Sequence, residues 1–187
     1  MQSSENKHRN IFLVGPMGVG KTTIGRMLAN ELKLTFKDSD QELEKRTGAD
    51  IPWIFDVEGE AGFREREAKI IDELTQESDV LIATGGGAVL REDNRRHLMA
   101  RGTVVFLDTT LEMQLKRLSK DKKRPLLQNQ DHRKVLSELK EKRDPIYQSV
   151  CDFKVMVSEQ NSRKVVNQIK RELSARGLIS RGEEGTS

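Results

Sequence analysis

The pattern most suggestive of chemistry lies near the start of the chain, at residues 15–22. These residues read Gly-Pro-Met-Gly-Val-Gly-Lys-Thr, the pattern G-x-x-x-x-G-K-[ST]. A short apolar run at 10–14 precedes them, and apolar residues at helical spacing follow over 21–32. A strand, a glycine-rich loop and a helix in this order favour a phosphate-binding loop over a chance glycine turn. In such a loop Lys21 reaches the β- and γ-phosphates of a nucleotide, and the Thr22 hydroxyl ligates Mg²⁺.

Two carboxylates form the next candidate group, Asp38 and Asp40, after a second strand-like run at 34–37. If this segment is extended, side chains two positions apart point the same way. Near a bound nucleotide, one carboxylate would hold Mg²⁺ and the other would take a proton from an attacking hydroxyl. The alternative is structural, with Asp40 only capping a helix that starts at Gln41.

Three consecutive glycines, Gly85–Gly87, follow another apolar run at 79–83. Glycines allow the backbone to approach a ligand closely, because they carry no side chain. A flexible turn is the alternative, but a turn rarely needs three glycines. The triplet therefore favours a ligand contact, although it would be a weak signal alone.

Four arginines are candidates for binding an anion, because a guanidinium group pairs bidentately with carboxylate or phosphate. They are Arg64, Arg66, Arg124 and Arg143. Most arginines are solvated surface residues, so context must select among them. Arg66 could equally be a helix-surface partner of an acidic neighbour, namely Glu60, Glu67 or Glu73.

A polar, basic stretch at 119–131 contains Arg124. In an enzyme that transfers a phosphoryl group, this stretch would act as a mobile lid that excludes water. A solvated loop or a nucleic-acid patch is the alternative. The chain has one tryptophan and one tyrosine, so stacking platforms for single-stranded nucleic acid are not evident.

The elements that must position these residues alternate along the chain. Apolar runs predict strands at 10–14, 34–37, 79–83, 103–107 and 153–157. Helical spacing predicts helices at 21–32, 40–47, 60–77, 91–100, 110–118, 131–147 and 161–176. Strands separated by helices indicate an α/β protein with a parallel sheet covered on both faces. The candidate residues follow strands or lie in polar connections, where such sheets bind ligands.

The composition indicates one domain with a heavily charged surface. The chain has 187 residues, 34% charged, with a net charge of +3. We expect one domain over 1–187, with a core at about 9–176 and loose termini at 1–8 and 178–187. The single cysteine, the absence of an apolar leader and the absence of a membrane-length apolar run predict a cytoplasmic protein without membrane contact. The small charge excess suits anionic small molecules and does not argue for nucleic acid.

Taken together, the motifs resemble the shikimate kinase family, in particular its bacterial type, over about residues 9–172. Any one of them is shared more widely, but the ordered set is highly specific. The set consists of Gly15–Thr22, Asp38–Asp40, Glu44–Gly48, Gly62–Glu67, Thr84–Val89, Arg124–Leu127 and Arg143–Tyr147.

This resemblance implies a three-layer P-loop NTPase fold of the nucleoside-monophosphate-kinase type, with a five-stranded parallel sheet. It implies transfer of the ATP γ-phosphoryl group to the 3-hydroxyl of shikimate, on the route to chorismate and aromatic amino acids, by an enzyme that works as a monomer. The residues implied to hold ATP and Mg²⁺ are Gly18, Val19, Gly20, Lys21, Thr22 and Thr23, with Asp38 holding Mg²⁺ through water.

The resemblance also implies the acceptor site. Asp40 would bind the shikimate hydroxyls as the candidate base, and Arg64 and Arg143 would clamp the carboxylate. The backbone near Gly86 and Gly87 would contact the ring. Arg124, on the lid, would meet the phosphates. Phe55 and Phe63 would form an apolar wall, and the segment 158–162, with Gln160, would lie against adenine.

Three alternatives stay open from the residues alone. The first is a P-loop kinase for another small polyol acid such as gluconate, which need not keep Arg64, Gly85–Gly87 and Arg143 together. The second is a nucleotide-binding regulatory module without turnover, which would be expected to lack a catalytic group. The third is a nucleic-acid-binding P-loop protein, which the basic stretch supports weakly and the small net charge opposes.

Overall fold

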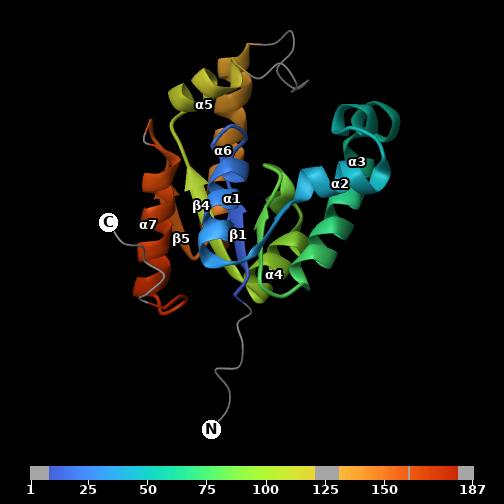
Figure 1. The fold of residues 1–187 in the computed structure, drawn as a ribbon. Helices are drawn as coiled ribbons and strands as arrows, with labels where there is room; N and C mark the ends of the chain where they lie inside the picture. Colours follow the sequence, from blue (N-terminus) through green and yellow to red (C-terminus); the bar gives the residue numbers. More distant parts are fainter. Residues whose placement is uncertain (1–8, 121–130, 160, 181–187) are drawn as a thin grey trace.

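The computed structural model describes residues 9–120, 131–159 and 161–180. Five strands alternate with helices along the chain (Figure 1). The strands are β1 (Ile11–Val14), β2 (Thr35–Asp38), β3 (Val80–Ala83), β4 (Thr103–Asp108) and β5 (Phe153–Met156). The helices are α1 (Lys21–Leu32), α2 (Ser39–Thr47), α3 (Ile51–Thr75), α4 (Glu92–Arg101), α5 (Leu111–Leu118), α6 (His132–Val150) and α7 (Ser162–Ala175), with a 3₁₀ turn η1 at Ala88–Leu90.

All strand pairs are parallel, and the strand order is β2-β3-β1-β4-β5. The central strands β1, β3 and β4 are buried at every residue, because helices cover both faces. The predicted α/β fold with a five-stranded parallel sheet is therefore confirmed.

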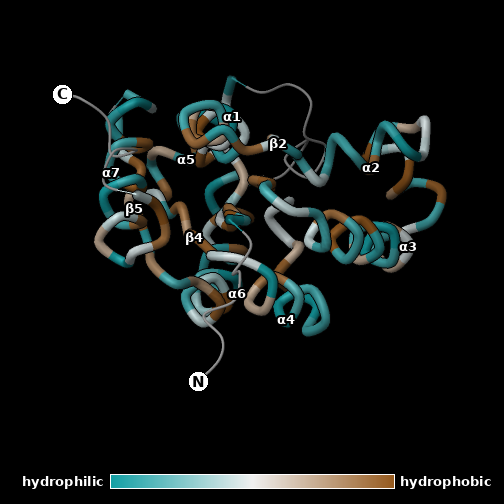
Figure 2. The backbone as a smooth tube through the Cα atoms, turned by 60° about the horizontal axis from the view of Figure 1, so that its bottom comes forward, coloured by the Kyte–Doolittle hydropathy of each residue, from teal (hydrophilic) through white to brown (hydrophobic). Residues whose placement is uncertain are grey.

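The helices form two layers around the sheet. In Figure 2, α1 and α7 lie on one side of the sheet, and α4 and α6 lie on the other. Each layer has its own apolar core. Leu28 of α1 and Ile169 of α7 belong to one core, whereas Leu98 of α4, Tyr147 of α6 and Ile71 of α3 belong to the other.

Helix α3 differs most from its prediction, because it starts at Ile51 rather than at residue 60. The Asp50 side chain accepts a hydrogen bond from Trp53 N (2.9 Å) and caps the helix. Gly59, at φ 72° and ψ 180°, interrupts the helical backbone and joins two helical parts at a kink. Figure 1 shows the first part of α3 set at an angle to the second. The other predicted boundaries lie within three residues of the observed ones.

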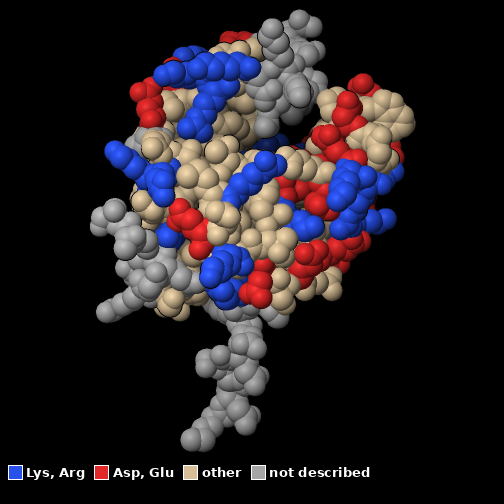
Figure 3. Space-filling model, viewed as in Figure 1, with Lys and Arg blue, Asp and Glu red and all other residues tan. Residues whose placement is uncertain are grey.

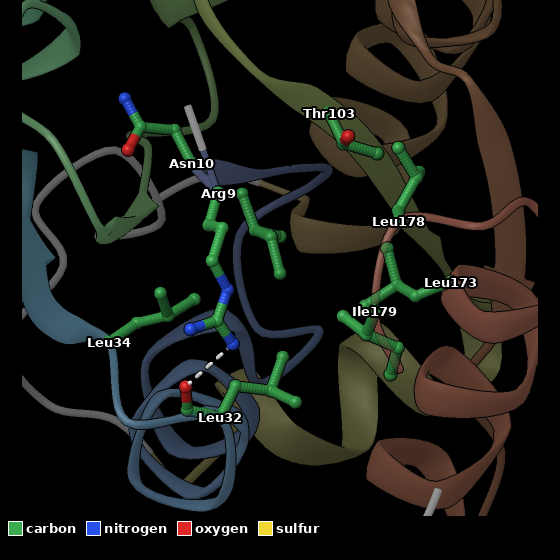
Figure 4. Close-up of a pocket in the computed structure, with 9 residues that line it drawn as sticks. Arg9, Asn10, Leu32, Leu34, Thr103, Leu173, Leu178 and Ile179 are labelled. Atoms are coloured by element: carbon green, nitrogen blue, oxygen red, sulfur yellow. Dashed lines mark hydrogen bonds between the residues drawn. The ribbon is translucent and has the colours of Figure 1, made fainter. Parts of the chain in front are cut away.

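The amino ends of the strands carry a small cavity with a mixed polar and apolar lining. A small cavity at the amino ends of β1 and β4 is lined by residues that include Leu34, Leu173 and Ile179 (Figure 4). Arg9 lies in it and donates to the Leu32 carbonyl (3.2 Å). Leu178 and Ile179 pack against the core, although the terminus from 178 onwards was predicted to be loose. Within the described ranges, no helix combines the length and the hydropathy that crossing a bilayer requires.

Candidate active site

The candidate residues meet where the parallel strands end. The glycine-rich loop follows β1, Asp38 is the last residue of β2, and Gly85–Gly87 follow β3. In Figure 1 these ends point to the part of the molecule that carries α2, α3 and α5. Figure 3 shows the surface hollowed between α2 and α3 on one side and α5 on the other.

The loop at residues 15–22 needs its glycines for conformation and for space. Gly15 has φ 147°, and a Cβ on it would lie 2.2 Å from the Leu107 carbonyl oxygen. Gly20, at φ 98°, precedes α1 without any side-chain cap for the first amides of the helix. An uncapped helix start with its dipole is a ready site for an anion. Lys21 Nζ donates to the carbonyls of Gly15 (2.7 Å) and Pro16 (2.8 Å), so it lies along the loop.

Helix α5 braces this loop through two residues that the sequence patterns did not indicate. Gln114, almost fully buried, donates to the Met17 carbonyl (3.0 Å). Arg117 Nη1 donates to the Val19 carbonyl (2.7 Å). A Cβ on Gly20 would lie 2.9 Å from the same Nη1 atom, so glycine leaves the room that Arg117 occupies.

Asp38 links β2, α2 and the loop. Its Oδ2 accepts from the Thr22 hydroxyl (2.7 Å), and its Oδ1 accepts from the amides of Asp40 and Gln41 (both 3.0 Å). Asp38 is thus the cap of α2, which begins at Ser39. The capping role predicted for Asp40 is therefore wrong, because Asp38 is the cap. The expectation that both carboxylates lie on one extended segment is also wrong, because Asp40 lies in the first turn of α2.

The side chains of Thr22 and Asp38 are of the kind that binds Mg²⁺. A hydroxyl and a carboxylate are hard oxygen donors, which Mg²⁺ prefers. The described residues contain no group of three or more acidic, histidine or cysteine side chains that could enclose a metal. Mg²⁺ in nucleotide sites usually takes only one or two protein ligands beside phosphate and water, so two donors suffice.

Asp40 reaches the glycine triplet from α2. A Cβ on Gly85 would lie 2.7 Å from Asp40 Oδ1 and 2.9 Å from Glu67 Oε2, so both carboxylates lie against this glycine. The Ser39 hydroxyl accepts from the Gly85 amide (3.0 Å) and ties α2 to the triplet.

Arg64 lies over the next glycine and is held by a buried carboxylate. Its Nη1 donates to Glu67 Oε1 (2.8 Å), and its guanidinium lies 5.0 Å from the Phe63 ring centroid. A Cβ on Gly87 would lie 2.3 Å from Arg64 Nη2. Burial raises the pKa of Glu67 above its ordinary value, although Arg64 and Arg143 oppose the shift. Glu67 is 1% exposed and was not singled out from the sequence, because one carboxylate among many on a charged helix carries no visible signal.

Arg143 approaches the same glycines from α6. Its Nη1 would lie 3.5 Å from a Cβ on Gly86. Tyr147, one turn further on, donates from Oη to the Gly86 carbonyl. Burial raises the pKa of Tyr147 to about 12, against the opposing charge of Arg143, so the phenol stays a donor at neutral pH.

The remaining predictions divide into one correction and two that the structure leaves open. Arg66 pairs with Glu58 (2.7 and 2.6 Å) and not with Glu60, Glu67 or Glu73. Arg124, with most of the predicted lid, and Gln160 lie outside the described residues.

Two guanidinium groups and two carboxylates therefore converge on the glycine triplet, beside a phosphate-type loop. Phe55 packs against Phe63 at 4.7 Å between ring centroids, and Phe63 in turn lies under the Arg64 guanidinium. A guanidinium pair suits a small carboxylated molecule, and a carboxylate beside it suits a hydroxyl group. The arrangement can therefore hold a small hydroxy acid next to a nucleotide.

Comparison with known proteins agrees with this site. A sequence model of the shikimate kinase family matches residues 17–174. The shikimate kinase of Vibrio parahaemolyticus is 55% identical over 168 residues, covering 90% of this chain and 98% of the relative. That of Psychromonas ingrahamii is 58% identical over 163 residues, covering 87% and 95%. A solved structure of shikimate kinase from Acinetobacter baumannii in complex with shikimate has a TM-score of 0.88 and 46% identity, covering 91% of this chain and 95% of that one. The chain belongs to the shikimate kinase family.

Proposed function

We propose that this protein transfers the γ-phosphoryl group of ATP to the 3-hydroxyl of shikimate, giving shikimate 3-phosphate and ADP in aromatic amino acid biosynthesis. The observation that carries this proposal is the convergence of Arg64 and Arg143 on Gly86 and Gly87, beside the loop at 15–22. Family membership supports the use of ATP and shikimate.

On the nucleotide side, the loop and the start of α1 bind the phosphates of ATP. The residues in contact are Gly18, Val19, Gly20, Lys21, Thr22 and Thr23. Lys21 now bonds the Gly15 and Pro16 carbonyls, and its flexible stem allows it to turn to the β- and γ-phosphates. Arg124 of the lid adds charge at the phosphates, and Gln160 lies against adenine.

Thr22, through its hydroxyl, and Asp38, through water, would hold Mg²⁺, and their side chains lie 2.7 Å apart. When bound, the metal ion neutralises charge on the β- and γ-phosphate oxygens. The second Asp38 oxygen accepts hydrogen bonds from the first amides of α2. The same carboxylate therefore positions the start of α2 and the Thr22 hydroxyl.

On the acceptor side, Arg64 and Arg143 clamp the carboxylate of shikimate. Glu67 holds Arg64 in place, and Tyr147 holds the Gly86 carbonyl, so the backbone of the triplet presents a fixed surface to the ring. Asp40 lies against Gly85 and binds the hydroxyl groups.

In the reaction, the 3-hydroxyl oxygen bonds to the γ-phosphorus while the bond from this phosphorus to the bridging oxygen of ADP breaks. Asp40 either takes the hydroxyl proton early or mainly orients the hydroxyl group, whose proton then leaves to Asp40 late in the transfer. Lys21 and Arg124 stabilise the charge on the transferred group. The two arginines also contribute to the rate acceleration, because an acceptor held in position reacts faster than one that diffuses freely.

We further propose that the enzyme acts as a cytoplasmic monomer on a small molecule, without nucleic acid or membrane. The site residues that the structure describes meet within a single copy of the chain, so this part of the site needs no second copy to be complete. The single cysteine and the need for ATP support a reducing, ATP-supplied compartment.

The test is a coupled assay of ADP release with ATP and Mg²⁺, comparing shikimate, quinate, gluconate and no acceptor. Release that depends on shikimate, and that Arg64→Ala abolishes while nucleotide binding persists, supports the proposal. Release with gluconate in place of shikimate, or release that needs no acceptor, contradicts it.

A further inference from the structure

The kink in α3 folds one part of the helix onto the other. Gly59 has a left-handed φ of 72°, and no atom lies within 4 Å of a Cβ placed on it. A Cβ on Gly62 would lie 2.6 Å from the Glu58 Cβ. In a straight helix, side chains four positions apart have Cβ atoms about 5–6 Å apart. Gly59 therefore allows the change of direction, and Gly62 allows the Glu58 side chain to pack directly against the backbone of the second part.

An ion pair closes this fold-back. Arg66 donates from Nε and Nη2 to the two oxygens of Glu58, at 2.7 and 2.6 Å. Residues eight positions apart in a straight helix are separated by about 12 Å along its axis. The bidentate contact thus exists only in the kinked helix. The hydrogen bond from Arg66 lowers the pKa of Glu58, so the pair stays charged at neutral pH.

The fold-back carries one wall of the acceptor site. Phe55, before the kink, packs on Phe63, after it, and the Arg64 guanidinium covers the Phe63 ring. Glu60, just past the kink, lies 3.5 Å from Arg64 Nη2. The surroundings of Arg64 therefore depend on how the first part of α3 lies against the second.

Only part of the segment 51–58 is fixed by the core. Ile54 is 1% exposed, whereas Trp53 and Val57 are 55% and 61% exposed. Figure 1 shows this segment at the outer end of the molecule, away from the sheet. From this segment Ile51, Ile54 and Phe55 pack against the core, and Glu58, next to the kink, adds a polar contact to the second part of α3.

We propose that Glu58 and Arg66 are a positioning pair, which holds residues 51–58 against Phe63 and thereby sets Arg64 for the carboxylate of the acceptor. The identity of the ligand that Arg64 binds rests on the proposed function. The contact between Glu58 and Arg66, called the clasp below, does not. Both side chains are occupied by their contact with each other on α3. We therefore expect the pair to act on acceptor binding and to leave the phosphate loop unchanged.

The kinetic test compares Arg66→Gln with the parent protein. We expect the KM for shikimate to rise about threefold, which corresponds to the usual contribution of an exposed ion pair with good geometry. The kcat, the KM for ATP and the Tm should stay nearly unchanged. The double variant Glu58→Arg/Arg66→Glu, which reverses the pair, restores most of the loss. Arg133→Gln is the matched control, because Arg133 makes an exposed bidentate pair with Glu112 (2.7 and 3.1 Å) away from α3.

Hydrogen exchange of the protein without any substrate tests the clasp independently of the reaction. Arg66→Gln is expected to speed exchange of the amides in 51–58, and Arg133→Gln is not. Exchange at the parent rate, or equal rises in the KM for ATP and shikimate, overturns the proposal. If the parent protein does not phosphorylate shikimate but the exchange result holds, the proposed function fails and the clasp stands.

Discussion

Replacing Gly87 by alanine is expected to separate acceptor binding from folding. The backbone of Gly87, at φ −97° and ψ 4°, accepts an alanine without strain. The added Cβ would lie 2.3 Å from Arg64 Nη2 and 2.6 Å from its Cζ and Nη1. Van der Waals contact needs about 3.5 Å, so the guanidinium must withdraw by about 1 Å. Arginine is flexible and can withdraw at small cost, so the Tm should change little.

The displacement matters for function, because it breaks the 2.8 Å bond between Arg64 and Glu67 and misplaces the clamp. A misplacement of this size costs on the order of a hundredfold in kcat/KM for shikimate, or about 2.7 kcal/mol. Steady-state kinetics measures it, with the KM for ATP as the internal comparison, because ATP binds at the loop at 15–22 and not at the clamp. If Gly87→Ala keeps a parent-like kcat/KM, the placement of Arg64 as the clamp is wrong.

Three further substitutions test the other parts of the site. Lys21→Ala is expected to lower kcat about a thousandfold through lost γ-phosphate stabilisation, and a near-parental kcat would rule out this role. Asp38→Asn keeps a good helix cap but weakens the metal ligand, so the Mg²⁺ concentration for half-maximal rate should rise about tenfold at unchanged Tm; an unchanged Mg²⁺ requirement would exclude Asp38. The pKa of Glu67 in the folded state is raised above 4.5, so the folded state binds more protons than the unfolded state between 4.5 and that raised pKa. The stability that this proton contributes is lost as the pH rises through the folded pKa. In urea unfolding, Glu67→Gln should therefore gain stability relative to the parent as the pH rises above 4.5, and a difference that stays constant with pH would contradict the raised pKa.

The fold was predictable because its signals are local. Short apolar runs such as 103–107 and helical runs such as 21–32 identify strands and helices without knowledge of their neighbours, and their alternation implies a parallel sheet. The loop at 15–22 was recognisable for the same reason, since strand, glycines and helix are contiguous.

Only the second part of helix α3 was predicted, because two glycines interrupt the helical pattern that joins it to the first part. Gly59 and Gly62 weaken a helical pattern when they are read along the chain. In the structure, both glycines allow the fold-back that Glu58 and Arg66 close. A bidentate pair eight residues apart has no signature in helical spacing, so nearer acidic neighbours were the only partners to suggest for Arg66.

Within the site, residue types were easier to predict than their relations. Asp38 lies beside the loop through Thr22, and Asp40 lies against Gly85. Which of the two caps α2 depends on whether the strand ends at residue 37 or 38. Glu67 became visible only through its burial beneath Arg64. Arg117 and Gln114 emerged only when α5 was placed against the loop.

The most direct test of the account is a crystal structure with shikimate, ADP and Mg²⁺ bound. We predict that the shikimate carboxylate lies between Arg64 and Arg143, with its ring on the backbone of Gly86 and Gly87. The 3-hydroxyl should face Asp40 and the phosphate end of the loop. A carboxylate bound away from both arginines, or a 3-hydroxyl turned away from Asp40, would contradict the central claim.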